Sequence, residues 1–120
     1  MAKKVLVVDD EADILKLAVI RLEAAGYEVL KVASSEEALK MLEQNRPDLI
    51  LLDMILPDMQ GDEFCKKVKE DPALKKIPVI LFTATIIGVP EKAREIGADD
   101  YIFKPFEPEE LLFKIKKFIG

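Results

Sequence analysis

Short runs of consecutive apolar residues recur along the chain, and charged or turn-forming residues bound each of them. Runs of about four residues, rich in valine, leucine and isoleucine, are typical of strands that are buried on both faces of a sheet. We therefore predict strands at Val5–Val8, Val29–Val32, Leu49–Leu52, Val79–Phe82 and Tyr101–Phe103.

The segments between these runs carry apolar residues three and four positions apart, which is the spacing of one helix face. The predicted helices are Glu11–Ala25, Ser34 or Ser35 to about Asn45, Asp62 to about Glu70, Pro90–Ile96 and Glu107–Ile119. The apolar stripe of the first consists of Ile14, Leu17, Ala18, Leu22 and Ala25. Gly26 and Gly97 follow the first and fourth helices, and glycine commonly ends a helix.

Strands and helices alternate along the whole sequence, and the predicted strands are buried. This order indicates an α/β fold, a doubly wound parallel sheet of five strands with five helices on its two faces. We expect one domain over residues 1–120. Ligands of such sheets bind beyond the carboxyl ends of the strands, so the residues just after each apolar run are the candidates for chemistry.

Those positions carry a set of charged and polar residues. Asp9, Asp10 and Glu11 follow the first run, Asp53 the third, Thr83 the fourth and Lys104 the fifth. Carboxylates gathered at one rim either raise each other's pKa values or require a cation, and oxygen ligands favour Mg²⁺. Together with a lysine and a hydroxyl they predict a phosphoryl site in which a carboxylate is the nucleophile. Taken singly, each residue also has an ordinary structural explanation, such as helix capping.

Composition narrows the function further. Lys and Arg number 18 and Asp and Glu 23, so the net charge of −5 argues against direct nucleic-acid binding. The chain has no histidine, which excludes histidine triads, histidine-ligated metals and a phosphohistidine of its own. Cys65 is the single cysteine, and the longest apolar run is far too short to cross a membrane. We expect a cytoplasmic protein without a membrane segment.

Four segments are similar to a known family. They are Val5–Glu11, Pro47–Met54, Phe82–Ala84 and Gly97–Phe106. Together they resemble the receiver domain of bacterial two-component response regulators, in particular the chemotaxis-type receiver, over the whole chain. The resemblance implies a flavodoxin-like sheet of strand order 2-1-3-4-5. It also implies a phosphorylation-dependent signalling switch rather than an enzyme that turns over a substrate.

The resemblance assigns a role to each candidate residue. Asp53 matches the aspartate that accepts a phosphoryl group from a sensor histidine kinase or phosphotransfer protein. Asp10 matches a direct Mg²⁺ ligand, Asp9 a ligand acting through water, and the backbone carbonyl of Ile55 a further ligand.

The remaining roles concern the response to phosphorylation. Lys104 matches the lysine that pairs with the phosphoryl group, Thr83 the hydroxyl that moves to meet it and Tyr101 the switch aromatic. The bond between Lys104 and Pro105 is expected to be cis.

Some residues depart from the family pattern. Leu56 and Gln60 replace its common residues in the loop after Asp53, and the stretch after Thr83 is unusually apolar. We expect Ile86, Ile87 and Val89 in a loop at the rim of the site, and Phe113 outward on the last helix. These residues suggest an output surface for an unknown partner or a phosphorylation-dependent homodimer.

Two alternatives belong to other classes. A Mg²⁺-dependent phosphatase with an aspartyl nucleophile would need an acid two residues after Asp53, where Ile55 stands. A flavodoxin-like cofactor binder would need a polar or glycine-rich phosphate loop after the first strand, where acids stand.

Overall fold

A computed structural model of the chain describes residues 2–10, 12–53, 61–83, 88–104 and 106–120, and of residues 12–15, 61 and 62 the backbone alone. Strands and helices alternate as predicted. They are β1 (Lys4–Val8), α1 (Ala12–Ala24), β2 (Glu28–Val32), α2 (Ser35–Gln44), β3 (Leu49–Leu52), α3 (Gly61–Glu70), β4 (Val79–Thr83), α4 (Val89–Ile96), β5 (Asp100–Phe103) and α5 (Pro108–Ile119). Within the described residues, no helix is both long and apolar enough to cross a bilayer.

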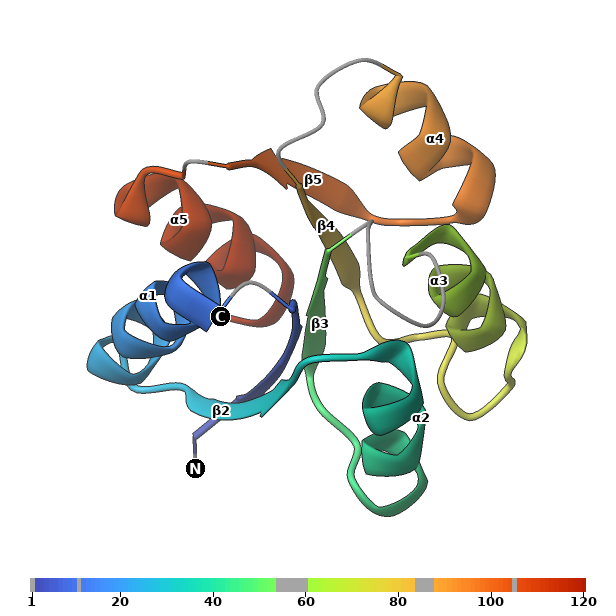
Figure 1. Cartoon of the computed structure of the whole chain (residues 1–120), viewed down its shortest axis with the longest axis horizontal. Helices are drawn as coiled ribbons and strands as arrows, with labels where there is room; N and C mark the ends of the chain where they lie inside the picture. The colour runs from blue at the N-terminus through green and yellow to red at the C-terminus, as the bar shows by residue number, and fades with distance from the viewer. Residues whose placement is uncertain (1, 11, 54–60, 84–87, 105) are drawn as a thin grey trace.

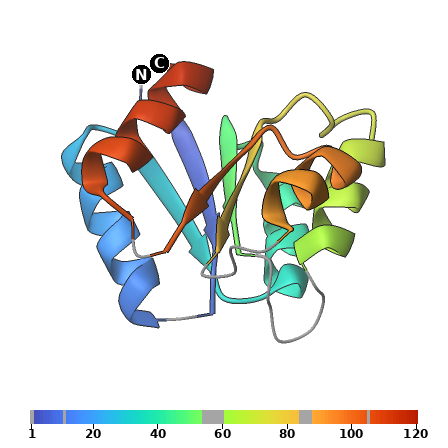
Figure 2. The same ribbon diagram turned by 90° about the horizontal axis from the view of Figure 1, so that it is seen from above.

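The strands form one parallel sheet of order β2-β1-β3-β4-β5, which confirms the predicted topology. Helices α1 and α5 cover one face, and α2, α3 and α4 cover the other (Figure 1). The same three layers are visible from above in Figure 2, with the twisted sheet between the two groups of helices. Strand β2 lies at one edge of the sheet, and no site residue follows it.

Side chains of each strand alternate between two separate cores. On β1, Val5 and Val7 pack with α1 and α5, whereas Leu6 and Val8 pack with the helices of the other face. The inner strands β1, β3 and β4 are buried at nearly every position, which explains why their sequences read as continuous apolar runs. This alternation also decides on which face the polar residues beyond each strand lie.

Helix ends follow their sequence signals. The side chain of Ser34 accepts a hydrogen bond from the backbone N–H of Glu37 at 3.2 Å and caps α2. Gly26 and Gly97 take positive φ angles of 95° and 82°, which residues with a side chain rarely adopt. Both glycines therefore end helices as predicted.

The predicted stripe of the first helix was wrong in part. Ala18 and Leu22, one turn apart, are fully buried, but 55% of Leu17 is exposed. Ala25 lies beyond the end of α1 and is exposed, and the side chain of Ile14 lies outside the described residues. Leu17 precedes Ala18 by about 100° of helix rotation, which takes it off the narrow line that faces the sheet.

Candidate functional site at the carboxyl ends of the strands

The sheet brings the predicted site residues to one rim. Asp9 directly follows β1 and Asp53 directly follows β3. The backbone N–H of Asp53 donates to the Val8 carbonyl at 2.9 Å, which extends the ladder between β1 and β3 by one bond. The backbone N–H of Lys104 donates likewise to the Thr83 carbonyl at 2.8 Å. Regular strand pairing thus fixes the backbone from which each functional side chain projects.

The alternation of the strands sorts these residues between the two faces. Asp53 continues the face of Leu51, and Lys104 continues the face of Ile102; both lie on the side of α1 and α5. Thr83 continues the face of Leu81, on the side of α3 and α4. The charged side chains of Asp53 and Lys104 therefore reach the rim from one face of the sheet, and the Thr83 hydroxyl reaches it from the other.

The ammonium of Lys104 lies between two buried carboxylates. Its Nζ is 2.6 Å from Oδ2 of Asp9, an ion pair, and 3.1 Å from Oδ2 of Asp53, to which it also donates a hydrogen bond. All three residues are less than a tenth exposed. Charges at such depth are stable only when they are paired, so the lysine holds the two acids at this rim.

A third carboxylate completes an acidic cluster. Oxygen atoms of Asp9, Asp10 and Asp53 all lie within 4.8 Å of one another, and Asp10 is exposed. An octahedral magnesium ion places opposite ligand oxygens about 4.2 Å apart, close to this spacing. Three hard oxygen donors with one side open to water therefore fit such an ion.

An aromatic ring flanks the same ammonium. Nζ of Lys104 lies over the ring of Phe82, 4.9 Å from its centroid. Phe106 packs against that ring with 5.3 Å between centroids. Sequence reasoning placed Phe82 in a strand and gave it no role at the site. The signal available was its parity, because it lies one position before Thr83 and so on the face of Lys104.

Tyr101 lies on the face of Thr83. It is half-buried, its ring is 5.4 Å from that of Phe103, and Lys114 lies over it at 5.0 Å. Lys114 also pairs with Asp100 at 3.1 Å. Tyr101, the switch aromatic expected from the resemblance, thus lies on the same face of the sheet as Thr83.

Several expectations fall outside the described residues: Ile55, Leu56, Gln60, Ile86, Ile87 and the bond to Pro105. Val89 was expected in a loop at the rim, and this was wrong. It is the first residue of α4 and is buried against the core. A proline at the next position suits the first turn of a helix, which explains the earlier start. Phe113 is 70% exposed, as predicted.

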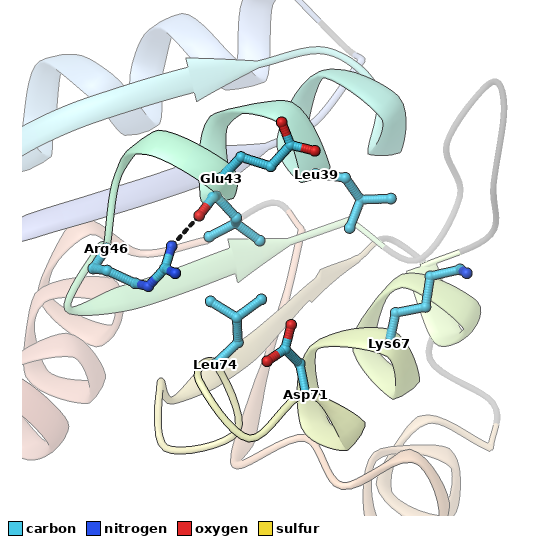
Figure 3. A pocket seen from close by; sticks show the side chains of 7 residues that line it. Leu39, Glu43, Arg46, Lys67, Asp71 and Leu74 are labelled. Atoms are coloured by element: carbon cyan, nitrogen blue, oxygen red, sulfur yellow. Dashed lines mark hydrogen bonds between the residues drawn. The ribbon is translucent and has the colours of Figure 1, made fainter.

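A separate hollow lies between α2 and α3 (Figure 3). Leu39, Leu42 and Leu74 form its apolar part, and charged residues such as Glu43 and Lys67 line its sides. Its volume is about 450 Å³. None of the residues gathered around Lys104 lines this hollow, so it is not part of the site.

Comparison with known proteins places residues 5–116 in the family "Response regulator receiver domain". The chain is 41% identical to the alkaline phosphatase synthesis transcriptional regulatory protein PhoP of Bacillus subtilis, covering 97% of this chain and 48% of that protein. It is also 41% identical to the phosphate regulon transcriptional regulatory protein PhoB of Pseudomonas aeruginosa, covering 97% and 51%. The chain therefore spans about half the length of these relatives. They are transcriptional regulators, so the chemotaxis-type subtype expected from the sequence is not supported.

Solved structures agree with the fold. A protein described as a response regulator from Chloroflexus aurantiacus is 38% identical with a TM-score of 0.95, covering 98% of each chain. The chemotaxis response regulator CheY4 of Vibrio cholerae is 33% identical with a TM-score of 0.92, covering 99% and 100%. The receiver domain of a sensor histidine kinase from Pseudomonas aeruginosa is 29% identical with a TM-score of 0.92, covering 100% and 99%. That structure has a magnesium ion in its active site cleft.

Proposed function

Because the chain belongs to the family of response regulator receiver domains, which are phosphorylation-dependent switches of two-component signalling, we propose that Asp53 is its phosphoacceptor. The observation that carries this proposal is the position of Asp53 in a buried rim, with Lys104 at 3.1 Å and two further carboxylates beside it. A nucleophilic carboxylate with a lysine and a cation site beside it is suited to phosphoryl transfer.

The reaction uses the carboxylate directly. An Oδ atom of Asp53 forms a bond to phosphorus, and the bond from phosphorus to the donor breaks, so the donor leaves with the bonding electrons. Lys104 is placed to pair with the oxygens of the transferred group, since its ammonium already lies against Asp53. Its positive charge would offset the charge that the phosphoryl group adds to an acidic site.

We propose that Asp9, Asp10 and Asp53 hold Mg²⁺, with the Ile55 carbonyl as a further ligand. The bound ion would supply positive charge to this acidic rim in addition to that of Lys104. Asp10 is exposed, whereas Asp9 is fully buried and paired to Lys104 at 2.6 Å. Asp10 can therefore offer an oxygen without breaking an ion pair, which supports its role as a direct ligand and that of Asp9 as a ligand through water.

This difference predicts unequal effects of two matched substitutions. Asp10→Asn should weaken Mg²⁺ binding by about tenfold or more, and Asp9→Asn should weaken it less. Isothermal titration calorimetry of both variants and the unaltered chain measures the two losses. Equal losses would contradict the assigned roles, and a larger loss for Asp9→Asn would reverse them.

The response to phosphorylation is proposed to run through Thr83 and Tyr101. Thr83 ends β4, and Tyr101 lies on the same face of the neighbouring strand β5. Movement of the hydroxyl toward the phosphoryl group would free space on this face, into which the half-buried ring of Tyr101 can rotate. Lys114, which lies over that ring, would lose or change its contact at the same time.

The partners follow from the chemistry. Since the chain has no histidine, the phosphoryl donor is proposed to be the phosphohistidine of a sensor kinase or phosphotransfer protein. We propose residues 1–120 as one receiver domain that acts as a switch and not as an enzyme with turnover. The comparisons give no support to the phosphatase alternative. The PhoP and PhoB relatives are transcriptional regulators, and the chain covers about half of their length. We propose that phosphorylation of this chain likewise controls transcription.

Phosphoryl uptake from a small donor tests the function. With acetyl phosphate and Mg²⁺, the chain should gain one phosphoryl group, detected as a mass increase of the intact protein. Amide resonances of β5 should shift with the same time course. A chain that stays unmodified with both a small donor and a phosphorylated kinase would refute the proposal.

A further inference from the structure

We propose that Phe82 is a positioning residue, whose ring holds the Lys104 ammonium in the place where it can pair with the phosphoryl group. The inference rests on the proposed function of Asp53 and Lys104. It adds an uncharged residue to the charged residues of the site.

The ammonium of Lys104 contacts both the two carboxylates and an aromatic ring. Asp9 and Asp53 lie 2.6 and 3.1 Å from Nζ, and the centroid of the Phe82 ring lies 4.9 Å from it. Phe82 is fully buried, and Phe106 packs against its ring. The ring is thus fixed by the core beneath it, and its face is presented to the lysine.

Phe82 is an aromatic residue at a position where the other strands of the site have aliphatic residues. The last side chains that the other site strands turn toward α1 and α5 are Val7, Leu51 and Ile102. All are aliphatic, and only a ring offers the negative face that attracts a cation. Hydrophobic packing alone would be satisfied by an aliphatic residue at Phe82 as well.

A lysine side chain has four rotatable bonds, so an ammonium at its end is easily misplaced. The two carboxylates hold Nζ by their charge, and the Phe82 ring adds a further, uncharged attraction to the same ammonium. The Phe82 ring stabilises the positions that keep Nζ over its face and therefore raises the fraction of molecules with the ammonium in place. Phosphoryl transfer should proceed in proportion to that fraction.

The first test is a double-mutant cycle on the rate of phosphorylation by acetyl phosphate. Phe82→Leu should slow the unaltered chain by about three- to tenfold. In a Lys104→Met background, which removes the ammonium, the same substitution should change the slow residual rate by less than about twofold. Phe82→Met, which replaces the ring by an unbranched and more adaptable apolar side chain, should repeat both results.

The second test does not depend on phosphorylation. Protons at the end of the Lys104 side chain should show an upfield ring-current shift in NMR spectra, and Phe82→Leu should abolish it. Phe64→Leu is the matched control, because Phe64 is equally buried but packs on the opposite face of the sheet. It should leave both the shift and the rate close to those of the unaltered chain.

The outcomes separate the two proposals. If the slowing by Phe82→Leu is the same in both backgrounds, Phe82 acts through core packing and the inference is overturned. Absence of the ring-current shift in the unaltered chain would overturn it as well. If the unaltered chain takes up no phosphoryl group while the shift is present and lost in Phe82→Leu, the proposed function fails but the placement of Lys104 by the ring stands.

Discussion

Asp53→Asn should reduce phosphoryl uptake from acetyl phosphate by more than about a thousandfold, to the background of the assay. The amide has nearly the same size as the carboxylate but no negative oxygen that can attack phosphorus. Folding should survive, because Lys104 keeps its ion pair with the buried Asp9. Intact-protein mass spectrometry over a time course with saturating donor and Mg²⁺ measures the uptake.

Asp48→Asn is a matched control, because Asp48 directly precedes β3 as Asp53 directly follows it. The Asp48 carboxylate accepts a hydrogen bond from the Lys4 backbone N–H at 2.8 Å, at the end of β3 opposite to Asp53. This variant makes the same chemical change outside the site and should be phosphorylated at the unaltered rate. Uptake by Asp53→Asn at that rate would mean that another acid, with Asp9 and Asp10 the nearest, is the acceptor.

The convergence of Asp53 and Lys104 could be predicted because it depends on chain direction alone. Parallel strands end at one rim, so a residue that follows a buried run reaches that rim whatever the details of packing. The same reasoning gives β2 no part in the site, since only Ala33 and Ser34 follow it. The apolar pattern was therefore sufficient to predict which residues meet at this rim.

Phe82 shows where that reasoning stops. In the sequence it is one more apolar residue of a buried run, and an aromatic there is fully explained by core packing. Its contact with Lys104 depends on the register of β4 against β5, in which Phe82 pairs with Ile102 two positions before the lysine. The apolar run gives the face on which Phe82 lies, but it does not give this pairing between residues far apart in the sequence.

The predictions for Leu17 and Val89 were wrong for a related reason. Periodicity predicts which residues share a helix face, but the width of the face that the sheet covers depends on how the helix lies on it. On α1 that width excludes Leu17, which is more than half exposed. For Val89, an apolar residue next to Pro90 was interpreted as loop, although both positions suit a first helical turn.

The second large effect concerns stability without metal. Lys104→Met should lower the free energy of unfolding in metal-free buffer by about 3–5 kcal/mol, because it leaves buried carboxylates without their ammonium. Mg²⁺ should restore much of this loss, since a cation bound only by the folded state stabilises it by mass action. Urea unfolding with EDTA and with saturating Mg²⁺ gives both values.

The gain from Mg²⁺ should be larger in Lys104→Met than in the unaltered chain, because the ammonium at 2.6 Å from Asp9 and 3.1 Å from Asp53 competes with the ion for the same oxygens. Lys114→Met is the control. This variant removes a lysine of α5 that pairs with Asp100 of β5 at 3.1 Å, away from the acidic cluster. Its loss of stability should be the same with and without Mg²⁺. Equal gains from Mg²⁺ in Lys104→Met and the unaltered chain would show that lysine and metal do not share the carboxylates. The inferred competition of Lys104 and Mg²⁺ for the oxygens of Asp9 and Asp53 would then be wrong.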